Sequence, residues 1–310
     1  MIITVTLNPA IDKTVGINNF AIDCVNRIST VRLDAGGKGI NVSKNVLSLG
    51  GESKAIGFLG GRAGNYIKSY LDEMGIANDF VFVKGETRTN LKIVDPLQHT
   101  NTDINEMGPE ITAENINEIG NCISQCVDEE SIIVFSGSVP TNVDPNIYHQ
   151  WICKAKTKGA KTILDADGEL LRMGIEAGPY LIKPNIHELE RLVARKITNI
   201  KETAECSRML MKRYGIEIVV VSMGDKGALF LNKEVTIFAK GLTVDVKSTV
   251  GAGDSMVAAF AHAIGEGYVF EKAVTLAVAA GTANVMTCGT ESSSLEMIMK
   301  LERKVQYEYL

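Results

Sequence analysis

Apolar runs and helical segments alternate along most of this chain. The runs 131–136 and 217–222 are rich in β-branched apolar side chains, as strands buried on both faces of a parallel sheet are. The pattern predicts strands at 2–7, 54–59, 80–83, 131–136, 161–165, 180–183 and 217–222. It predicts helices at 40–49, 64–74, 112–127, 145–158, 186–194, 202–214, 254–266, 270–287 and 292–304. We therefore expect an α/β fold with a mostly parallel central sheet and helices on both faces.

Two segments, 12–35 and 86–106, interrupt this alternation. Within them, 31–34 and 90–94 alternate apolar and polar positions as half-exposed strands do. We expect a small β-sheet outside the main core that acts as a lid, because both segments also carry charged residues suited to a substrate. Ordinary edge hairpins are the alternative. The chain has no internal repeat or long linker, so we expect one domain over 1–310.

Charge and composition limit the classes of partner. The net charge is −5, and Lys and Arg form no run, so we expect no nucleic-acid partner. No apolar stretch is long enough to span a bilayer, and the N-terminus lacks a signal peptide, so we expect no membrane partner. The six cysteines form no C-x-x-C pair and the four histidines show no ligand spacing, which favours a cytoplasmic protein without a structural metal.

The segment 246–255 joins a β-rich stretch to an apolar helix. Gly251 and Gly253 allow a tight turn whose backbone N–H groups approach a ligand, and a helix N-terminus attracts phosphate. Asp254 adds a carboxylate beside this anion site, which makes chemical sense if it takes a proton during phosphoryl transfer. A plain turn followed by an Asp cap is the alternative, and the segment alone does not decide between them.

A second glycine cluster, 35–42, also precedes a helix. Its glycines allow close backbone approach, Lys38 supplies a mobile positive charge, and Asn41 can bridge two hydroxyl groups, which suits a sugar phosphate. The cluster fails the Walker pattern because Gly39 follows Lys38. No G-x-G-x-x-G occurs in the chain, so a dinucleotide-binding dehydrogenase loses its main support.

Further candidates lie near strand ends and in the two lid segments. Asp12 follows the first strand, on the edge of the sheet where α/β proteins bind ligands, although alone it would be a solvated turn residue. Arg27, Arg88 and Lys92 lie in the lid segments, where a cluster around a phosphate is the functional interpretation and solvated surface the other.

Another strand is followed by Lys183 and a helix that begins at Pro184. Asn185 and Glu188 share one face of its first turn and suit a hydrated Mg²⁺ that bridges phosphates. A simple helix start with Glu in its first turn is the alternative. The tight turn 222–227 is weak support for any function.

Taken together and in this order, these motifs resemble those of the ribokinase-like (PfkB) carbohydrate kinase family. The resemblance runs from residue 2 to about 290, and the pairing of 36–42 with 249–255 is highly specific to that family. It implies a ribokinase-like three-layer α/β/α sandwich with a small β-sheet lid. It also implies ATP as co-substrate, Mg²⁺ as cofactor and a homodimer formed through the lid.

Within the family, the segments 7–12, 87–92, 136–140 and 248–254 are similar to those of kinases that phosphorylate fructose 1-phosphate at the C6 hydroxyl. The expected substrates are thus ATP and a phosphorylated ketohexose. Kinases of tagatose 6-phosphate, which tend to lack the Asn90-x-Lys92 pattern, are the alternative. A non-catalytic sugar-phosphate binding protein on the same fold is a further one.

The resemblance also implies roles for individual residues. Asp254 would be the catalytic base, and Gly251, Ala252 and Gly253 would form the anion hole. The sugar and its phosphate would be held by Asp12, Arg27, Gly36, Gly37, Lys38, Asn41, Arg88, Asn90 and Ser136. The nucleotide would be held by Lys183, Asn185, Ser222, Gly224, Gly227, Thr249, Val278 and Thr282, and Glu188 would hold Mg²⁺ through water. Ser248 stands where potassium-using members carry Asp, so a requirement for a monovalent cation is doubtful.

Overall fold

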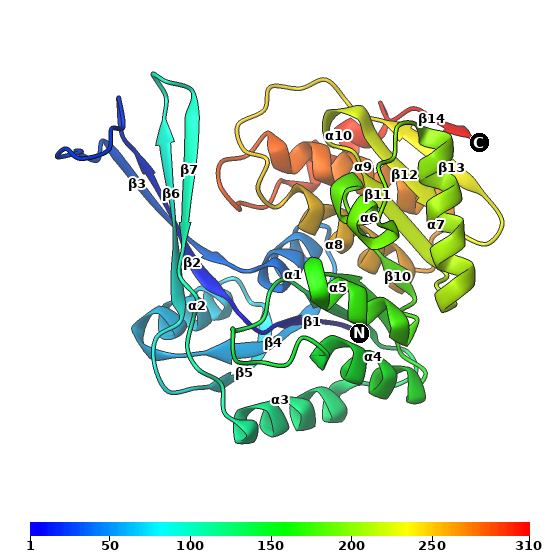
Figure 1. Ribbon diagram of the computed structural model, residues 1–310, viewed down its shortest axis with the longest axis horizontal. Coiled ribbons are helices and arrows are strands. Elements are labelled where there is room, and N and C mark those ends of the chain that lie inside the picture. The colour runs from blue at the N-terminus through cyan, green and yellow to red at the C-terminus, as the bar shows by residue number, and fades with distance from the viewer.

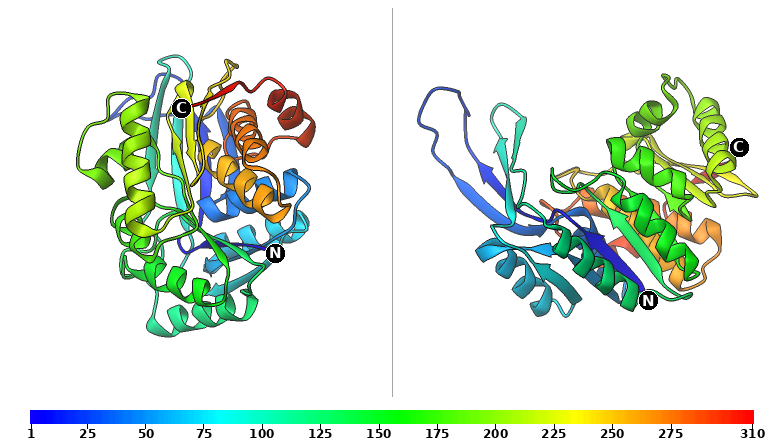
Figure 2. Two further views of the ribbon diagram at one scale, coloured as in Figure 1. Left: turned by 90° about the vertical axis from the view of Figure 1, so that its right-hand side faces the viewer. Right: turned by 60° about the horizontal axis from the view of Figure 1, so that its bottom comes forward.

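The computed structural model describes residues 1–310 and contains two β-sheets. The main sheet is made of β1 (Ile2–Thr6), β4 (Ser53–Leu59), β5 (Ala77–Phe82), β8 (Ile132–Ser136), β9 (Lys161–Asp165), β10 (Leu181–Ile182), β11 (Ile218–Ser222), β12 (Gly227–Leu231), β13 (Thr236–Lys240) and β14 (Tyr307–Tyr309). The small sheet is made of β2 (Ala10–Gly16), β3 (Thr30–Gly36), β6 (Arg88–Asp95) and β7 (Thr100–Asn105). Figures 1 and 2 show the small sheet projecting from the main body.

The main sheet is parallel over most of its width. Its spatial order is β14-β13-β12-β11-β10-β9-β8-β1-β4-β5, and only the pairs from β11 to β14 are antiparallel. The strand that begins the chain, β1, pairs with β4 on one side and β8 on the other. The strand order therefore reverses at β1, and a ligand site is expected at the carboxyl ends of β1 and its neighbours.

Helices cover both faces of the main sheet. One face carries α3 (Ala113–Cys126), α4 (Ile147–Thr157), α5 (Gly168–Gly174), α6 (Ile186–Val193) and α7 (Ile200–Tyr214). The other carries α1 (Lys38–Ser48), α2 (Gly61–Glu73), α8 (Ala252–Gly265), α9 (Phe270–Val285) and α10 (Leu295–Glu302). None of these helices combines the length and the apolar content that a membrane crossing needs.

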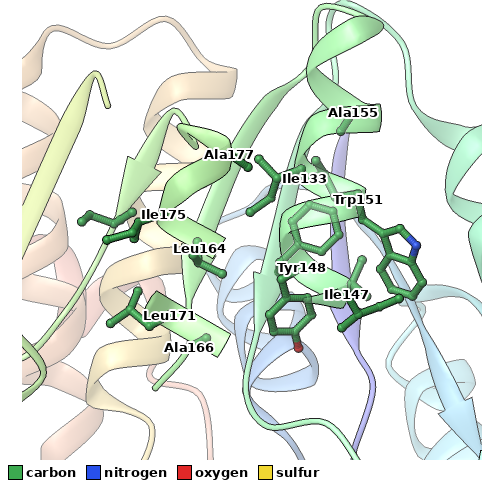
Figure 3. Close-up of a cluster of buried hydrophobic side chains, with 14 of the residues drawn as sticks. Ile133, Ile147, Tyr148, Trp151, Ala155, Leu164, Ala166, Leu171, Ile175 and Ala177 are labelled. Atoms are coloured by element: carbon green, nitrogen blue, oxygen red, sulfur yellow. The ribbon is translucent and has the colours of Figure 1, made fainter. Parts of the chain in front are cut away.

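Successive residues of the central strands pack into opposite cores. In β8, Ile133 and Phe135 join Tyr148 and Trp151 of α4 in one core, which Figure 3 draws in part. The alternate residues Ile132 and Val134 face the core of α8 and α9. This is the physical reason why the strand is apolar from Ile132 to Phe135: neither of its faces meets water.

The small sheet has a polar and an apolar face. Strand register puts Asp12 opposite both Asp34 and Asn90, so these side chains share one face. On the other face, Lys13 lies opposite Leu33 and Leu91, and Leu91 lies opposite Ile104. Leu33 and Ile104 are exposed, and Val15 and Ile93 belong to a small apolar cluster of this sheet.

The expected α/β architecture is confirmed, with a mostly parallel sheet, helices on both faces and a separate small sheet. The small sheet begins at Ala10, slightly before the expected boundary. Four elements were not delimited by the apolar pattern: the short helix α5 and the strands β12, β13 and β14. Their lengths of 7, 5, 5 and 3 residues are too short for a periodicity to develop.

Candidate active site

A cavity of about 1140 Å³ lies between the carboxyl edge of the main sheet and the polar face of the small sheet. Pockets for one small ligand usually measure roughly 300–1,000 Å³, so this cavity has room for two. Nearly all the residues that the sequence singled out line it: Asp12, Gly37, Lys38, Asn41, Arg88, Asn90, Lys183, Asn185, Glu188, Ser222, Gly224, Gly227, Thr249, Gly251, Ala252, Gly253, Asp254, Val278 and Thr282.

The carboxylate of Asp254 lies at the centre of this lining. Gly251 caps α8 in the left-handed conformation with φ 85°, which leaves Asp254 in the first turn of the helix, only 6% exposed. Its Oδ2 accepts a hydrogen bond of 2.8 Å from Nδ2 of Asn41 in α1. The two helices are joined again where Ser255 donates to Asn45 at 3.0 Å. The carboxylate therefore has a fixed position at the helix N-terminus.

Burial is the main reason why the pKa of Asp254 is raised to about 6. The charge of Asp165 raises this pKa too, whereas Lys38, Asn41 and Lys183 act in the opposite direction. Asp254 is thus a carboxylate at neutral pH that can still take up a proton. Such a pKa suits a general base that works near pH 7.

Two lysines and a second buried carboxylate surround Asp254. Asp165 lies at the end of β9 and is 1% exposed. Its Oδ1 lies 3.3 Å from Nζ of Lys38 and 3.3 Å from Nζ of Lys183. Gly253 lets Lys183 approach the turn, because a Cβ there would lie 3.0 Å from its Nζ. The lysines thus flank the N-terminus of α8, where backbone N–H groups already favour anions.

The small sheet contributes polar side chains to one end of the cavity. Asn90 donates to Oδ1 of Asp12 at 2.9 Å, and Arg88 donates to the carbonyl of Glu106 at 3.2 Å. Burial raises the pKa of Asp12, and Asn90 opposes this rise. Gly36 does not line the cavity, but a Cβ at Gly36 would lie 2.0 Å from Oδ2 of Asp12. Its role is therefore to make room for that carboxylate.

Unpartnered polar atoms gather in this cavity. Eleven buried side-chain N or O atoms lack a hydrogen-bond partner, and six of them belong to residues that line the cavity. These six are Oγ1 of Thr6, Oδ1 of Asn8, Oδ1 of Asn41, Nε of Arg88, Oδ1 of Asn90 and Oδ2 of Asp165. Because buried polar groups rarely stay unpaired, this concentration indicates a ligand with several hydroxyl or phosphate groups.

The opposite end of the cavity is more apolar. Val278 and Thr282 of α9 lie there with Met256 of α8 and with the segment 241–246, which precedes the turn. The turns that hold Ser222, Gly224, Gly227 and Thr249 complete this end. An apolar wall beside a helix N-terminus fits a molecule that has a flat ring at one end and phosphates at the other.

Asn185 and Glu188 cap the start of α6, so they are not two free metal ligands. Oδ1 of Asn185 accepts from the backbone N–H of Glu188, and Oε2 of Glu188 accepts from that of Asn185, which is a capping box. Oδ1 of Asn185 and Oε2 of Glu188 each accept one of these bonds, and Oε1 of Glu188 makes none. No group of three or more His, Cys, Asp or Glu side chains could enclose a metal ion. A divalent cation here would need water and ligand phosphates to complete its coordination.

Three further expectations are not met at the cavity. Lys92 of β6 does not line it, and its Nζ lies 3.7 Å from Oδ1 of Asp103 in β7. Arg27 lies on the exposed connection between β2 and β3 and does not line it, because the small sheet carries that connection away from the main body. Ser136 is fully buried inside β8, and the residues that reach the cavity are the next two, Gly137 and Ser138. The residues that reach the cavity after β8 therefore lie one and two positions beyond the expected Ser136.

Sequence reasoning missed Asn8, Asp165 and the segment 241–246. Asn8 and Asp165 follow or end strands β1 and β9 at the carboxyl edge of the sheet. The argument that singled out Asp12 applies equally to them, so the signal was present. The segment 241–246 alternates apolar and polar residues like many edge strands, and nothing in it points to a ligand.

Comparisons with known proteins agree with this geometry. The model of a family described as "pfkB family carbohydrate kinase" matches residues 3–297. A 1-phosphofructokinase from Borreliella burgdorferi is 37% identical over 287 residues, which cover 92% of each chain. Another from Bacillus subtilis is 36% identical over 304 residues, 97% of this chain and 99% of that one. Among solved structures, phosphofructokinase-2 from Escherichia coli in complex with potassium has a TM-score of 0.93 at 30% identity, covering 98% of both chains.

Gly37, which precedes Lys38, offers a test of the close packing at the site. Its φ is +115°, and a Cβ there would lie 2.8 Å from Cγ2 of Thr6 and 3.1 Å from Cα of Pro9. We expect Gly37→Ala to lower the free energy of unfolding by about 2–4 kcal/mol, since it adds overpacking to backbone strain. Urea unfolding followed by circular dichroism measures this loss.

Gly50→Ala is the matched control. Gly50 also has a positive φ, +83°, but nothing lies within 4 Å of its missing Cβ. It should lose only about 1 kcal/mol, which is the strain of the left-handed backbone. Equal losses in the two variants would contradict the packing argument.

Proposed function

Because this chain belongs to the pfkB family of carbohydrate kinases, we propose that it phosphorylates fructose 1-phosphate at the C6 hydroxyl. ATP is the donor, and the products are fructose 1,6-bisphosphate and ADP. The observation that carries the proposal is the position of Asp254, which is buried at a helix N-terminus between a polar end and a more apolar end of one cavity. The 1-phosphofructokinases among its relatives support the choice of substrate.

Asp254 acts as the general base in this mechanism. Its carboxylate accepts the proton of the C6 hydroxyl while the hydroxyl oxygen attacks the γ-phosphorus in line with the departing ADP oxygen. The backbone N–H groups of Gly251, Ala252 and Gly253 and the ammonium group of Lys183 stabilise the negative charge of the transferring group. The proton then leaves Asp254 for solvent once the products have gone.

The acceptor occupies the end formed by the small sheet. Asp12, Asn41 and Asn90 hold its hydroxyl groups, and Gly37 lets the backbone approach the sugar. Arg88 and Lys38 hold the phosphate that the sugar already carries, since both are cationic and line this end. The unpartnered atoms of Asn8, Asn41, Asn90 and Arg88 support a ligand of this kind.

The nucleotide occupies the other end. Lys183 and Asn185 lie nearest its phosphates, and the turns that hold Ser222, Gly224, Gly227 and Thr249 enclose the rest. Val278 and Thr282 border the adenine ring. This assignment is supported by the apolar wall that α8, α9 and the segment 241–246 provide on that side of the cavity.

Mg²⁺ fits this site as a partner of the ATP phosphates. When bound, it supplies positive charge to the transferring phosphoryl group. Glu188 would hold it, through water, because Oε1 of this buried carboxylate remains free after helix capping. The proposed requirement for Mg²⁺ thus depends on few protein ligands, which is common for this ion.

The residue at 248 argues against a requirement for a monovalent cation. Ser248 offers a hydroxyl where potassium-using relatives carry a carboxylate. Its Oγ accepts from the backbone N–H of Val250 at 3.3 Å. The potassium complex of phosphofructokinase-2 makes the question worth a direct comparison of potassium with sodium salts. A cytoplasmic location likewise stays a prediction, made from the cysteine pattern.

The apolar face of the small sheet supports a homodimer formed through the lid. Leu33 and Ile104 are 46% and 52% exposed on this face. An open sheet face of this kind needs a cover, and a second copy supplies an identical one. In this arrangement the small sheet closes over the acceptor and excludes water, which limits hydrolysis of ATP.

Release of ADP, measured over a panel of acceptors, tests the proposed substrate. We expect the highest kcat/KM for fructose 1-phosphate, as the 1-phosphofructokinases among the relatives suggest. We expect the lowest for fructose, because Arg88 and Lys38 provide for an acceptor that already carries a phosphate. Tagatose 6-phosphate, fructose 6-phosphate and fructose complete the panel. Preference for tagatose 6-phosphate would favour the alternative kinase, and binding without ADP release would favour the non-catalytic protein.

Asp254→Asn tests the general base. We expect kcat to fall by roughly 10²–10⁴-fold, because the amide cannot accept the proton. In the wild-type protein, kcat/KM should fall with decreasing pH below about 6, since only the carboxylate form of Asp254 is active. Glu266→Gln, which removes an exposed carboxylate from the end of α8, is the matched control and should retain turnover. Near-normal turnover of Asp254→Asn would exclude this residue as the base.

Leu33→Lys tests the dimer. A charge on the apolar face costs desolvation in an interface but nothing in a monomer, so this variant should sediment as a monomer where the wild-type protein sediments as a dimer. Met299→Lys, at an apolar position of α10 that is 47% exposed, is the matched control and should stay dimeric. A wild-type protein that is monomeric at all concentrations would contradict the proposal.

A further inference from the structure

The buried carboxylate of Asp165 contacts both lysines that line the cavity. One atom, Oδ1, lies 3.3 Å from Nζ of Lys38 and 3.3 Å from Nζ of Lys183. The other, Oδ2, is buried and has no partner. A single carboxylate oxygen therefore joins a cation on the acceptor side of the site to a cation on the nucleotide side.

Of the three side chains Asp165, Lys38 and Lys183, Asp165 has the most rigid position. It ends β9, a central strand held on both sides: Ser136 of β8 lies opposite Asp165, and β10 pairs with the two preceding residues. Its carbonyl accepts a hydrogen bond of 3.0 Å from the N–H of Gly137. Lysine side chains, in contrast, have four flexible methylene groups. The fixed carboxylate thus determines where the two ammonium groups lie.

Electrostatics keep Asp165 and Lys38 charged. Burial alone would raise the pKa of Asp165, but Lys183 and Lys38 outweigh it, and the pKa is lowered. Burial likewise opposes the charge of Lys38, whose pKa is nevertheless raised by Asp165 and other carboxylates. A neutral Asp165 side chain would hold the two ammonium groups less firmly than the carboxylate does.

We propose that Asp165 is a positioning residue that holds Lys38 and Lys183 on either side of Asp254, so that the phosphates of acceptor and nucleotide meet preset positive charges. The inference rests on the proposed kinase function, which it deepens. In this scheme Oδ1 of Asp165 acts through the two lysines. Its effect must therefore appear on both substrates at once.

The alternative is a buried ion group that only stabilises the fold. Such a group would change stability and the amount of active protein, but it would not change the affinity of both substrates in parallel. Asp254 faces Lys38 and Lys44 from α1, Asp165 from β9 and Lys183 after β10, and of these only Asp165 carries a charge that raises its pKa.

Asp165→Asn removes the charge and keeps the shape. We expect the KM values for ATP and for the preferred ketohexose phosphate each to rise by about tenfold, and kcat to fall by roughly 10²-fold, because misplaced charges weaken the transition state. The acid limb of kcat/KM should move to lower pH by about one unit, since Asp254 loses a neighbouring negative charge and the freed lysines act on it more strongly.

Calorimetry with MgADP gives a readout that needs no turnover. Its affinity should fall by about tenfold in Asp165→Asn, in parallel with the KM for ATP. Glu169→Gln is the matched control, because it removes an exposed carboxylate from the neighbouring helix α5 and leaves both lysines untouched. Its kinetics, MgADP affinity and pH profile should equal those of the wild-type protein.

Asp165→Glu keeps the charge but moves it by one methylene. We expect higher KM values for both substrates with the acid limb unchanged. If Asp165→Asn shows no cooperative melting, the decision rests on this variant, and unchanged KM values in it would overturn the proposal. In a folded Asp165→Asn, a change in only one KM or an unmoved acid limb would overturn it too.

Failure of the proposed function is a separate outcome. It would appear as a wild-type protein that phosphorylates no ketohexose phosphate. The MgADP affinities of wild-type protein, Asp165→Asn and Glu169→Gln would still decide the nucleotide half of the proposal. Equal affinities in all three proteins would overturn it, whatever the substrate.

Discussion

The site depends on keeping two carboxylates charged inside the protein, next to the phosphates that it is built to bind. Asp165 and Asp254 are both nearly inaccessible to water, and isolated buried charges of one sign would be unstable. Lys38 and Lys183 balance them, and the N-terminus of α8 adds partial positive charge. The same cations then serve bound anions, so one arrangement meets the needs of both stability and chemistry.

The arrangement is possible because parallel strands end at a common edge. β1, β8, β9 and β10 bring Asn8, Ser138, Asp165 and Lys183 to this edge from segments far apart in the chain. The glycine turns before α1 and α8 then let the backbone come close enough for Asn41 to bond Asp254 directly. The small sheet adds the remaining wall through its polar face, while its alternation leaves the opposite face apolar and open.

Much of this could be predicted from the sequence, because local signals coincide with function at several positions. The glycines next to Lys38 and Asp254 indicate tight turns at two helix starts, and both turns line the cavity. Asp165 was missed although it ends a predicted strand, because the partners that fix its carboxylate lie 127 and 18 residues away along the chain. Arg27, expected at the acceptor's phosphate, does not line the cavity of its own chain, because the sequence does not give the direction in which a hairpin leaves the core.

The sequence by itself determined the layered α/β fold, the helix starts and the residue types needed for phosphoryl transfer. These follow from apolar periodicity and turn chemistry, which act over a few neighbouring residues. Only the tertiary structure decided that Ser136 is buried and that one oxygen of Asp165 joins two lysines. The reason is physical: burial and charge pairing depend on which strands become neighbours, and that is a property of the whole sheet.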